Sequence, residues 1–446
     1  MAKVSVIGGG LAGCEAAWQL AERGHKVTLI EMRPVRNTPA HQTDGFAELV
    51  CTNSFKSEDL GNAHGLLKSE MRTMGSILLR AADATKVPAG TALAVDRVRF
   101  SAYLTDLISS HPNITVERRE LTTLPDGPSI IATGPLTSDA LTREIQALLG
   151  DAGLAFYDSI APIISHDSID LNIAFFESRW EKGEGADYLN CPMDREQYTH
   201  FIEQLRAADV YPGHDWENIP YFEGCLPIEV MAERGADTLR FGPMRPIGLH
   251  DPRTGRRPWA VVQLRREDRE GQMWNLVGFQ TRLRTGEQKR VFRLIPGLEN
   301  AEFLRWGSIH RNTYLNFPER LNHYGAAPTR PDLIFAGQLT GVEGYTESSA
   351  SGILAGANMD RLLRGLEPIL PPSSTMLGGL FRYLREAPPH RFSPMNSNFG
   401  LLDSLPGAPR DKQKRREATI QRAVDHFQEW ARTHDLLDPS ATPAGV

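Results

Sequence analysis

Residues 3–31 read KVSVIGGGLAGCEAAWQLAERGHKVTLIE, and this stretch decides the fold. The apolar run Lys3–Ile7 predicts a short strand, and a helix-forming run follows the glycines until Gly24, which is typical of a helix C-terminus. Lys26–Ile30 predicts a second strand, which Glu31 closes. Strand, glycine turn, helix and strand within about 30 residues indicate a βαβ unit, the building block of a parallel α/β sheet.

The glycine turn of this unit fits the pattern G-x-G-x-x-G. Gly8 permits the tight turn out of the strand, Gly10 lets a pyrophosphate approach because it has no Cβ, and Gly13 allows helix and strand to pack closely. Glu31 stands about twenty residues further on, where an acid takes the ribose hydroxyls. The alternative is a glycine-rich turn without a ligand. We predict a dinucleotide site that contains Gly8, Gly9, Gly10, Leu11, Ala12, Gly13 and Glu31.

Two later segments favour FAD over NAD as the dinucleotide. Ile131-Ala132-Thr133-Gly134 is similar to the strand-to-turn segment that runs under the nucleotide in flavoproteins with two dinucleotide folds. Residues 332–337, DLIFAG, with the turn Gly341–Gly344 and the small-residue helix after it, resemble the segment that closes over the flavin ring. The residues expected to contact FAD in these segments are Thr133, Gly134, Gly337 and Gly344.

The composition of the chain changes from about residue 156, where aromatic residues, prolines and arginines become frequent. Strand-like pieces follow at 260–264 (AVVQL) and 274–279 (WNLVGF), and the pattern of the nucleotide fold returns near 332. We therefore predict an α/β protein in which an α+β domain is inserted into a FAD-binding Rossmann-like domain of the two-dinucleotide-fold type. The expected ranges are 1–155 and 329–446 for the FAD-binding domain, which ends in a helical tail, and 156–328 for the insertion.

Two further helices are predicted outside these segments. Leu66–Ala82 has the pattern of one continuous helix. The last helix, at about 411–434, carries Val424 and Phe427 among apolar residues at helical spacing. Its start is basic, with Lys412, Lys414, Arg415 and Arg416.

The composition is that of an ordinary globular protein, since 41% of the 446 residues are hydrophobic and 23% are charged. No run reaches about 18 apolar residues, and no signal peptide opens the chain, so we expect a cytoplasmic protein without membrane contact. The net charge of −6 neither indicates nor excludes nucleic-acid binding, because a basic face can coexist with an acidic average. No C-x-x-C pair occurs, and we predict no metal site.

The four cysteines divide into two groups. Cys14 lies in the first turn of the βαβ helix and Cys191 in LNCPM, and we interpret both as packing residues. Cys51 lies in a polar loop after the βαβ unit, and Cys225 lies in the turn FEGCLP. The local sequence leaves packing and catalysis equally open for Cys51 and Cys225.

The segments around these two cysteines resemble the family of folate- and FAD-dependent tRNA (uracil-5-)-methyltransferases, which make ribothymidine in the T loop of bacterial tRNA. The larger flavoproteins that modify the wobble uridine share the glycine turn and the late flavin segment, but they are much longer, and the cysteine segments here follow the methyltransferases. The matching segments run nearly end to end: GGGLAGCEAAWQLA (8–21), ELVCTNSFKS (48–57), FEGCLPIEVMAERG (222–235), TLRFGPMRPIGL (238–249), VGFQTRL (277–283), GSIHRNTYLN (307–316), FAGQLTGVEGYTESSASG (335–352) and SPMNSNFGLL (393–402).

The resemblance implies reductive methylation of C5 of a T-loop uridine. Uracil C5 is a poor nucleophile, and a thiolate that adds at C6 turns the ring into an enolate, which can attack a one-carbon electrophile. 5,10-Methylenetetrahydrofolate would supply the carbon and NAD(P)H would reduce the FAD, without S-adenosylmethionine. Cys225 would be the nucleophile, and Cys51 the thiol that removes the C5 proton or assists release. The opposite assignment of the two thiols stays open.

Further site residues follow from the resemblance and from residue chemistry. Tyr345 would stack on the pterin or the flavin. A guanidinium fork suits carboxylates and phosphates, so arginines are candidates for folate, flavin or phosphate contacts. Phosphates of the tRNA would meet Arg253, Arg256 and Arg257 and the basic start of the last helix. The candidate substrate contacts are Arg282, His310, Arg311 and Asn312.

Two other functions are compatible with parts of the sequence. An NAD(P)H-dependent FAD oxidoreductase without tRNA would need the glycine turn, but the two cysteine segments argue against it. A tRNA-binding or folding factor with structural FAD would need neither the two loop thiols nor a turn that closes over the flavin.

Overall fold

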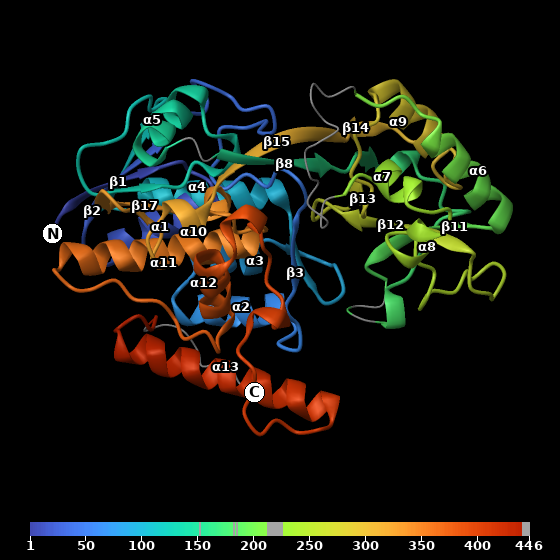
Figure 1. The fold of residues 1–446 in the computed structure, drawn as a ribbon. Helices are drawn as coiled ribbons and strands as arrows, with labels where there is room; N and C mark the ends of the chain where they lie inside the picture. Colours follow the sequence, from blue (N-terminus) through green and yellow to red (C-terminus); the bar gives the residue numbers. More distant parts are fainter. Residues whose placement is uncertain (151–152, 182, 184–185, 212–225, 439–446) are drawn as a thin grey trace.

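The computed structural model describes residues 1–150, 153–181, 183, 186–211 and 226–438. Two parts lie side by side, one built by both chain ends and the other by the middle of the chain (Figure 1). Two long antiparallel strands, β8 (Gly153–Ile160) and β15 (Ser308–Leu315), run between the two parts. The chain therefore leaves the first part and returns to it along one pair of strands.

The first part is built on a six-stranded sheet of order β16-β17-β7-β1-β2-β6. Its strands pair in parallel except for β16, which is antiparallel to β17. β1 lies in the middle, so the glycine turn after it is flanked by the ends of β2 and β7. The strands are β1 (Lys3–Ile7), β2 (Lys26–Glu31), β6 (Ile114–Arg118), β7 (Ser129–Ile131), β16 (Ala326–Ala327) and β17 (Arg330–Phe335).

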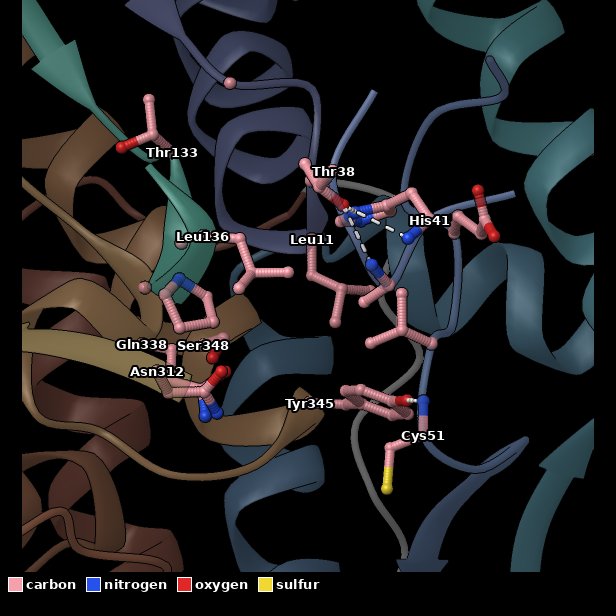
Figure 2. A pocket seen from close by; sticks show the side chains of 18 of the residues that line it. Leu11, Thr38, His41, Cys51, Thr133, Leu136, Asn312, Gln338, Tyr345 and Ser348 are labelled. Atoms are coloured by element: carbon pink, nitrogen blue, oxygen red, sulfur yellow. Dashed lines mark hydrogen bonds between the residues drawn. The ribbon is translucent and has the colours of Figure 1, made fainter. Parts of the chain in front are cut away.

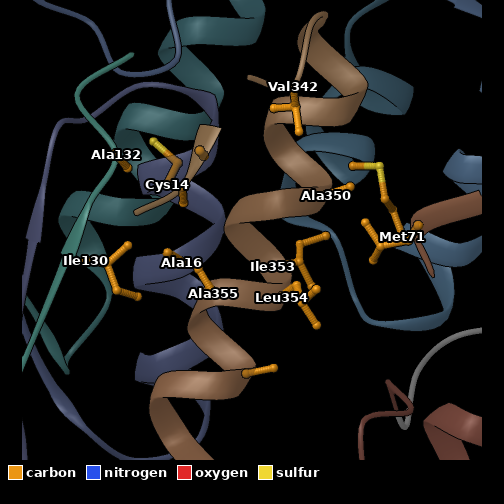
Figure 3. Packing of buried hydrophobic residues seen from close by; sticks show 14 of the residues in the cluster. Cys14, Ala16, Met71, Ile130, Ala132, Val342, Ala350, Ile353, Leu354 and Ala355 are labelled. Carbon is orange, nitrogen blue, oxygen red and sulfur yellow. The ribbon is translucent and has the colours of Figure 1, made fainter. Parts of the chain in front are cut away.

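Two helices of small residues pack against each other beside this sheet, α1 (Leu11–Glu22) and α11 (Tyr345–Leu363). A Cβ on Gly352 would lie 2.2 Å from the carbonyl oxygen of Ala12, so the helices approach too closely there for any side chain. Ala16 of α1 and Ala355 of α11 face each other in this contact (Figure 3). The close packing fixes the start of α11 next to the glycine turn.

The remaining helices and a small sheet complete the first part. β3 (Ser54–Ser57), β5 (Ala92–Val95) and β4 (Lys86–Val87) form a three-stranded antiparallel sheet. The C-terminal helix lies at the edge of this part (Figure 1). The helices are α2 (Ala63–Thr73), α3 (Ile77–Ala84), α4 (Arg97–Ser110), α5 (Asp139–Leu149), α10 (Phe317–Arg320), α12 (Met376–Glu386) and α13 (Lys412–Thr433).

The prediction of one helix over Leu66–Ala82 was wrong, because α2 and α3 are separate helices. Gly75 between them adopts φ +72°, a left-handed conformation that ends a helix. The side chain of Ser76 then accepts a hydrogen bond from the backbone N–H of Leu79 and caps α3. The apolar spacing continues across the break, which is why periodicity alone suggested one helix.

The middle of the chain forms a second sheet, in which all described pairs are antiparallel, of order β10-β11-β12-β13-β9-β14. It has a core of its own around Trp274 and Phe279. The strands are β9 (Ile163–Ser165), β10 (Phe175–Phe176), β11 (Tyr188–Met193), β12 (Ala260–Arg266), β13 (Met273–Leu276) and β14 (Phe303–Arg305), and the helices are α6 (Arg195–Arg206), α7 (Ile228–Glu233), α8 (Thr238–Phe241) and α9 (Thr285–Phe292).

The predicted fold class, a Rossmann-like α/β fold with an inserted α+β unit, is confirmed. The predicted boundary between residues 155 and 156 falls within β8, and the boundary between 328 and 329 falls between β16 and β17. The exact domain limits stay predictions. No helix in the described part of the chain is long and apolar enough to cross a membrane.

Candidate functional site

A cavity of about 380 Å³ opens at the end of β1, where the two parts of the protein meet. The glycine turn, the loop around Cys51, the turn at Thr133 and the start of α11 line it. Figure 2 shows the side chains of Leu11, Cys51 and Tyr345 around this space. Both β12 and β13 of the inserted domain contribute to the wall, through Arg265 and Asn275 respectively.

The glycines of the turn have different environments. Gly8 has φ +101°, and a Cβ on it would lie 2.5 Å from the carbonyl oxygen of Ala132. A Cβ on Gly13 would lie 1.8 Å from the carbonyl oxygen of Gly8, so Gly13 keeps α1 close to the strand. A Cβ on Gly10 would meet no atom within 4 Å and would project into the cavity. Gly8, Gly10, Leu11 and Ala12 line the cavity, whereas Gly9 and Gly13 lie behind its wall.

Glu31 is a buried carboxylate at the cavity wall, at the end of β2. Its Oε2 accepts a hydrogen bond of 2.7 Å from the N–H of Gly9, and its Oε1 accepts from the N–H and the Nε of Arg33 at 3.0 and 2.9 Å. Burial raises the pKa of Glu31, but the charge and hydrogen bonds of Arg33 outweigh burial, so the pKa lies below its usual value. Glu31 is therefore ionised and held in one orientation.

Arg33 is a site residue that the sequence did not reveal, and its side chain is only 2% exposed. Its Nη1 donates to Oε2 of Glu48 at 3.1 Å and to the carbonyl oxygen of Thr43 at 3.1 Å. The carboxylates of Glu31 and Glu48 thus share one buried guanidinium. The only sequence signal for this arrangement was the closeness of Arg33 to Glu31.

His41 lines the same side of the cavity. Its Nδ1 lies 2.6 Å from Oγ1 of Thr38, within hydrogen-bonding distance (Figure 2). Burial and, after it, the positive charge of Arg33 lower the pKa of His41 to about 4. The imidazole is therefore neutral at pH 7.

The loop that carries Cys51 is held by a tyrosine hydroxyl from α11. Oη of Tyr345 accepts hydrogen bonds from the backbone N–H groups of Cys51 and Thr52, at 2.8 and 3.1 Å. Figure 2 shows the tyrosine ring between Leu11 and Cys51, and the ring also packs on Phe55 with centroids 5.8 Å apart. Burial raises the pKa of Tyr345, so the phenol stays neutral. Tyr345 thus positions the Cys51 loop while its ring borders the cavity.

The inserted domain holds the same loop from the other side. Nε and Nη2 of Arg265 donate to Oδ1 of Asn53 at 3.0 Å and to Oγ1 of Thr52 at 2.5 Å. Before the cysteine, Nη1 of Arg97 donates to the carbonyl oxygen of Leu49 at 3.0 Å, and Arg97 forms a buried ion pair with Glu267 of the inserted domain. The position of Cys51 therefore depends on both parts of the protein.

Two asparagines supply polar groups on the far wall of the cavity. Asn312 on β15, a predicted contact residue, lines the cavity and is 3% exposed (Figure 2). Asn275 on β13 was not predicted, and it is also 3% exposed. Among the described residues, Nδ2 of Asn275 has no hydrogen-bond partner. A buried amide without a protein partner is suited to bind a ligand.

Other predicted residues lie elsewhere or outside the described residues. Arg282 does not line the cavity, and its Nε lies 3.8 Å from Oε1 of Glu229 in the inserted domain. The side chains of His310 and Arg311 lie outside the described residues, and so does all of Cys225. The remaining two cysteines, Cys14 and Cys191, are fully buried as expected for packing residues, and burial raises the pKa of both thiols.

The predicted tRNA contacts lie away from the cavity. Arg253 forms an ion pair of 2.7 Å with the buried Asp251. Arg416 donates to the carbonyl oxygen of Gly61 and stacks over Phe399, and all four basic residues at the start of α13, Arg416 included, are exposed. No cluster of His, Cys, Asp and Glu that could hold a metal ion occurs in the part of the chain that the structure describes.

The parallel sheet, the glycine turn and the acid at the end of β2 define the class of dinucleotide-binding α/β proteins. Residues 3–367 match the family described as glucose inhibited division protein A. Within it, the chain belongs to the family of methylenetetrahydrofolate--tRNA-(uracil-5-)-methyltransferases TrmFO, which confirms the resemblance seen in the sequence.

The relatives match along nearly their whole length. TrmFO of Geobacter sulfurreducens is 54% identical over 431 residues, which are 96% of this chain and 99% of that protein. TrmFO of Enterococcus faecalis is 55% identical over 423 residues, 95% of this chain and 97% of that protein. The crystal structure of GidA from Aquifex aeolicus superposes with a TM-score of 0.70 at 18% identity, over 98% of this chain and 77% of GidA, and so shares the fold.

Proposed function

We propose that this protein methylates C5 of a T-loop uridine in tRNA, with carbon from 5,10-methylenetetrahydrofolate and electrons passed from NAD(P)H through FAD. The observation that carries the proposal is that the Cys51 loop and the glycine turn line one cavity, so a thiol lies beside the dinucleotide site. The names of relatives at 54% and 55% identity support the folate, the tRNA and the uracil. We propose the cytoplasm as the site of the reaction, because tRNA and folate are its substrates.

The cavity fits FAD. Gly10 leaves open space where a Cβ would stand, and the unpaired N–H groups of the first turn of α1 suit a pyrophosphate. Glu31 presents a fixed carboxylate for ribose hydroxyls, and Thr133, Gly134, Gly337 and Gly344 line the same space. Bound FAD supplies the electrons that take the transferred carbon from the methylene to the methyl level.

The two thiols divide the work on the uracil. The thiolate of Cys225 adds to C6, a C–S bond forms, and the electrons of the C5–C6 double bond move into an enolate that makes C5 nucleophilic. After C5 has gained the carbon, Cys51 accepts the C5 proton, and the C–S bond breaks to release the thiolate and restore the double bond. Tyr345 and Arg265 hold the Cys51 loop in place for this proton transfer.

Polar contacts to the folate come from the wall opposite the glycine turn. We assign Asn312 to this role because it lines the cavity, and we keep His310 and Arg311 as candidates from the same strand. Arg282 is the weaker candidate for a folate contact, since its backbone N–H and its side chain both face Glu229.

The decisive experiment follows the origin of the methyl group. The purified holoenzyme is incubated with an unmodified tRNA transcript, NAD(P)H and methylenetetrahydrofolate labelled in the one-carbon unit. We expect label at C5 of one T-loop uracil and none when labelled S-adenosylmethionine replaces the folate. Oxidation of NAD(P)H without any label in the tRNA would support a plain oxidoreductase, and tRNA binding without either reaction would support a folding factor.

The assignment of the two thiols is tested with tRNA that carries 5-fluorouridine. Fluorine cannot leave C5 as a cation, so a thiolate that has added to C6 stays attached after the carbon transfer. We expect Cys51→Ala to form a covalent protein–tRNA complex and Cys225→Ala to form none. The reverse result would exchange the two roles.

A further inference from the structure

A second hollow of about 680 Å³ lies on the inserted domain, between the end of β11, the end of α8 and the loop before β12. None of the described residues lines both this hollow and the cavity that contains Cys51. Figure 1 shows α8 and β11 on the side of the inserted domain away from the first part. We call it the arginine groove after its lining residues Arg195, Arg240, Arg253 and Arg257.

The charge of the arginine groove differs from that of the whole chain. Four arginines and two carboxylates line it, a local charge of +2 on a protein of net charge −6. Both carboxylates are engaged, because Asp194 caps α6 by accepting the N–H of Gln197 at 2.8 Å and Asp251 is paired with Arg253. Within the described residues, no carboxylate forms an ion pair with Arg195 or Arg257. The groove therefore attracts an anion.

Trp259 holds two of the arginines at the groove. The guanidinium carbon of Arg240 lies 3.6 Å from the centroid of the indole and that of Arg195 lies 5.4 Å from it. Nε of Arg240 also donates to the carbonyl oxygen of Trp259 at 3.0 Å. These contacts limit the rotamers of the two side chains, so less entropy is lost when an anion binds.

An exposed aromatic ring completes the groove. Phe241, the last residue of α8, lines the groove and is 80% exposed. A phenylalanine in water lacks the hydrophobic stabilisation that burial would give it. Arginines beside an exposed aromatic ring are the combination with which proteins bind single-stranded nucleic acid, since phosphates meet the cations and a base stacks on the ring.

We propose that the arginine groove binds an unpaired nucleotide of the tRNA, with the base stacked on Phe241 and the adjoining phosphates at Arg195 and Arg257. The proposal rests on the proposed function for the identity of the RNA, and on the charge and the exposed ring for the class of ligand. None of the described residues that line the groove carries a sulfhydryl group, so the groove anchors the substrate while another nucleotide reacts at the Cys51 cavity.

The test measures binding of an unmodified tRNA transcript by fluorescence anisotropy at several salt concentrations. We expect Phe241→Ala to weaken binding about tenfold, and Phe241→Tyr to bind like the wild type because it keeps a stacking ring. Arg195→Ala and Arg257→Ala should each lower the slope of log affinity against log salt by about one. Leu304→Ala and Arg143→Ala, exposed residues elsewhere, serve as matched controls.

Two readouts separate the groove from the proposed function. Flavin absorbance and NAD(P)H oxidation without tRNA should stay unchanged in all these variants. If the wild type binds tRNA but does not methylate it, the proposed function fails and the groove is still tested by the binding series. If Phe241→Ala binds tRNA with wild-type affinity, the proposal is overturned. It is also overturned if the groove variants bind polyglutamylated folate more weakly but tRNA normally, because the groove would then bind the acidic folate tail.

Discussion

The Cys51 cavity and the arginine groove use arginine in opposite ways. At the cavity, Arg33 lines the wall and Arg97 holds the Cys51 loop, and both are largely buried and paired with carboxylates, so they orient neighbouring groups inside the protein. In the groove, Arg195 and Arg257 stand at the surface beside an exposed ring. The net charge of −6 therefore combines two uses of arginine: buried ion pairs orient groups at the cavity, and exposed cations give the groove a local positive charge.

Removal of the proposed nucleophile is expected to have the largest effect on methylation. It should leave FAD binding and tRNA binding at the arginine groove unchanged. Cys225→Ala should abolish methylation, because no other group then adds to C6, while flavin content and tRNA affinity stay at wild-type levels. The measurement is label transfer together with anisotropy. Cys191→Ala, the change of a buried cysteine in the same domain, is the control and should keep turnover. Normal methylation by Cys225→Ala would refute the nucleophile assignment.

The glycine turn offers the next largest effect. Gly10→Ala should fold normally but lose FAD, because its Cβ meets no protein atom within 4 Å and projects into the cavity. Gly13→Ala should instead destabilise the fold, since its Cβ would lie 1.8 Å from the carbonyl oxygen of Gly8. Flavin absorbance and thermal unfolding distinguish the two outcomes.

The control for both variants is Gly286→Ala, which also has no neighbour within 4 Å but lies in α9. It should retain FAD and stability. If Gly10→Ala lost tRNA affinity together with FAD, the cavity and the arginine groove would not be independent, because the groove would then depend on the cofactor.

A smaller effect is expected from the tyrosine that holds the Cys51 loop. Tyr345→Phe removes the acceptor of two backbone N–H groups and should destabilise the protein by about 1–3 kcal/mol. The rate constant kcat should fall about tenfold because Cys51 is no longer fixed, and the tRNA affinity should not change. Tyr383→Phe, which removes a hydroxyl that donates to Ser393, is the matched control. An unchanged kcat would show that Tyr345 does not position the thiol.

The smallest effect is a pH dependence of stability at the cavity. The pKa of His41 is lowered to about 4 in the folded protein from 6.5, so the unfolded chain binds a proton first as the pH falls. The contribution of neutral His41 is complete above pH 6.5 and is lost progressively as the pH falls toward 4. His41→Asn should remove this component of the urea unfolding curve, and His200→Asn, an exposed histidine on α6, should not.

Local patterns predicted the fold well, because the elements that carry it are continuous in sequence. β1, α1 and β2 lie where the apolar runs and Gly24 placed them, and Glu31 ends β2 as expected. The break between α2 and α3 was missed because the hydrophobic spacing is the same on both sides of Gly75.

The site was predicted only where a residue carries a motif. Tyr345 was expected to stack, and the structure adds that its hydroxyl holds a loop 294 residues away. The hydrogen bond from Arg265 to Asn53 joins two domains across 212 residues, and no local pattern contains such a pair. Arg282 has the right chemistry for a ligand, but folding gives it Glu229 as a neighbour. The charged partners of a residue depend on the tertiary structure, and the spacing of residues in the sequence does not predict them.

The strands β8 and β15 show how the inserted domain is connected to the dinucleotide fold. Their register pairs Ser308 with Ile160 and Leu315 with Gly153, so they form the two arms of a β-hairpin whose turn is the entire inserted domain. The inserted domain can be replaced without any change in the order of the strands in the parallel sheet. Residues 160 and 308 are paired neighbours, so a tight turn is enough to connect them. The inserted domain is thus joined to the dinucleotide fold by one pair of strands, and its exposed arginines can change while the dinucleotide fold stays the same.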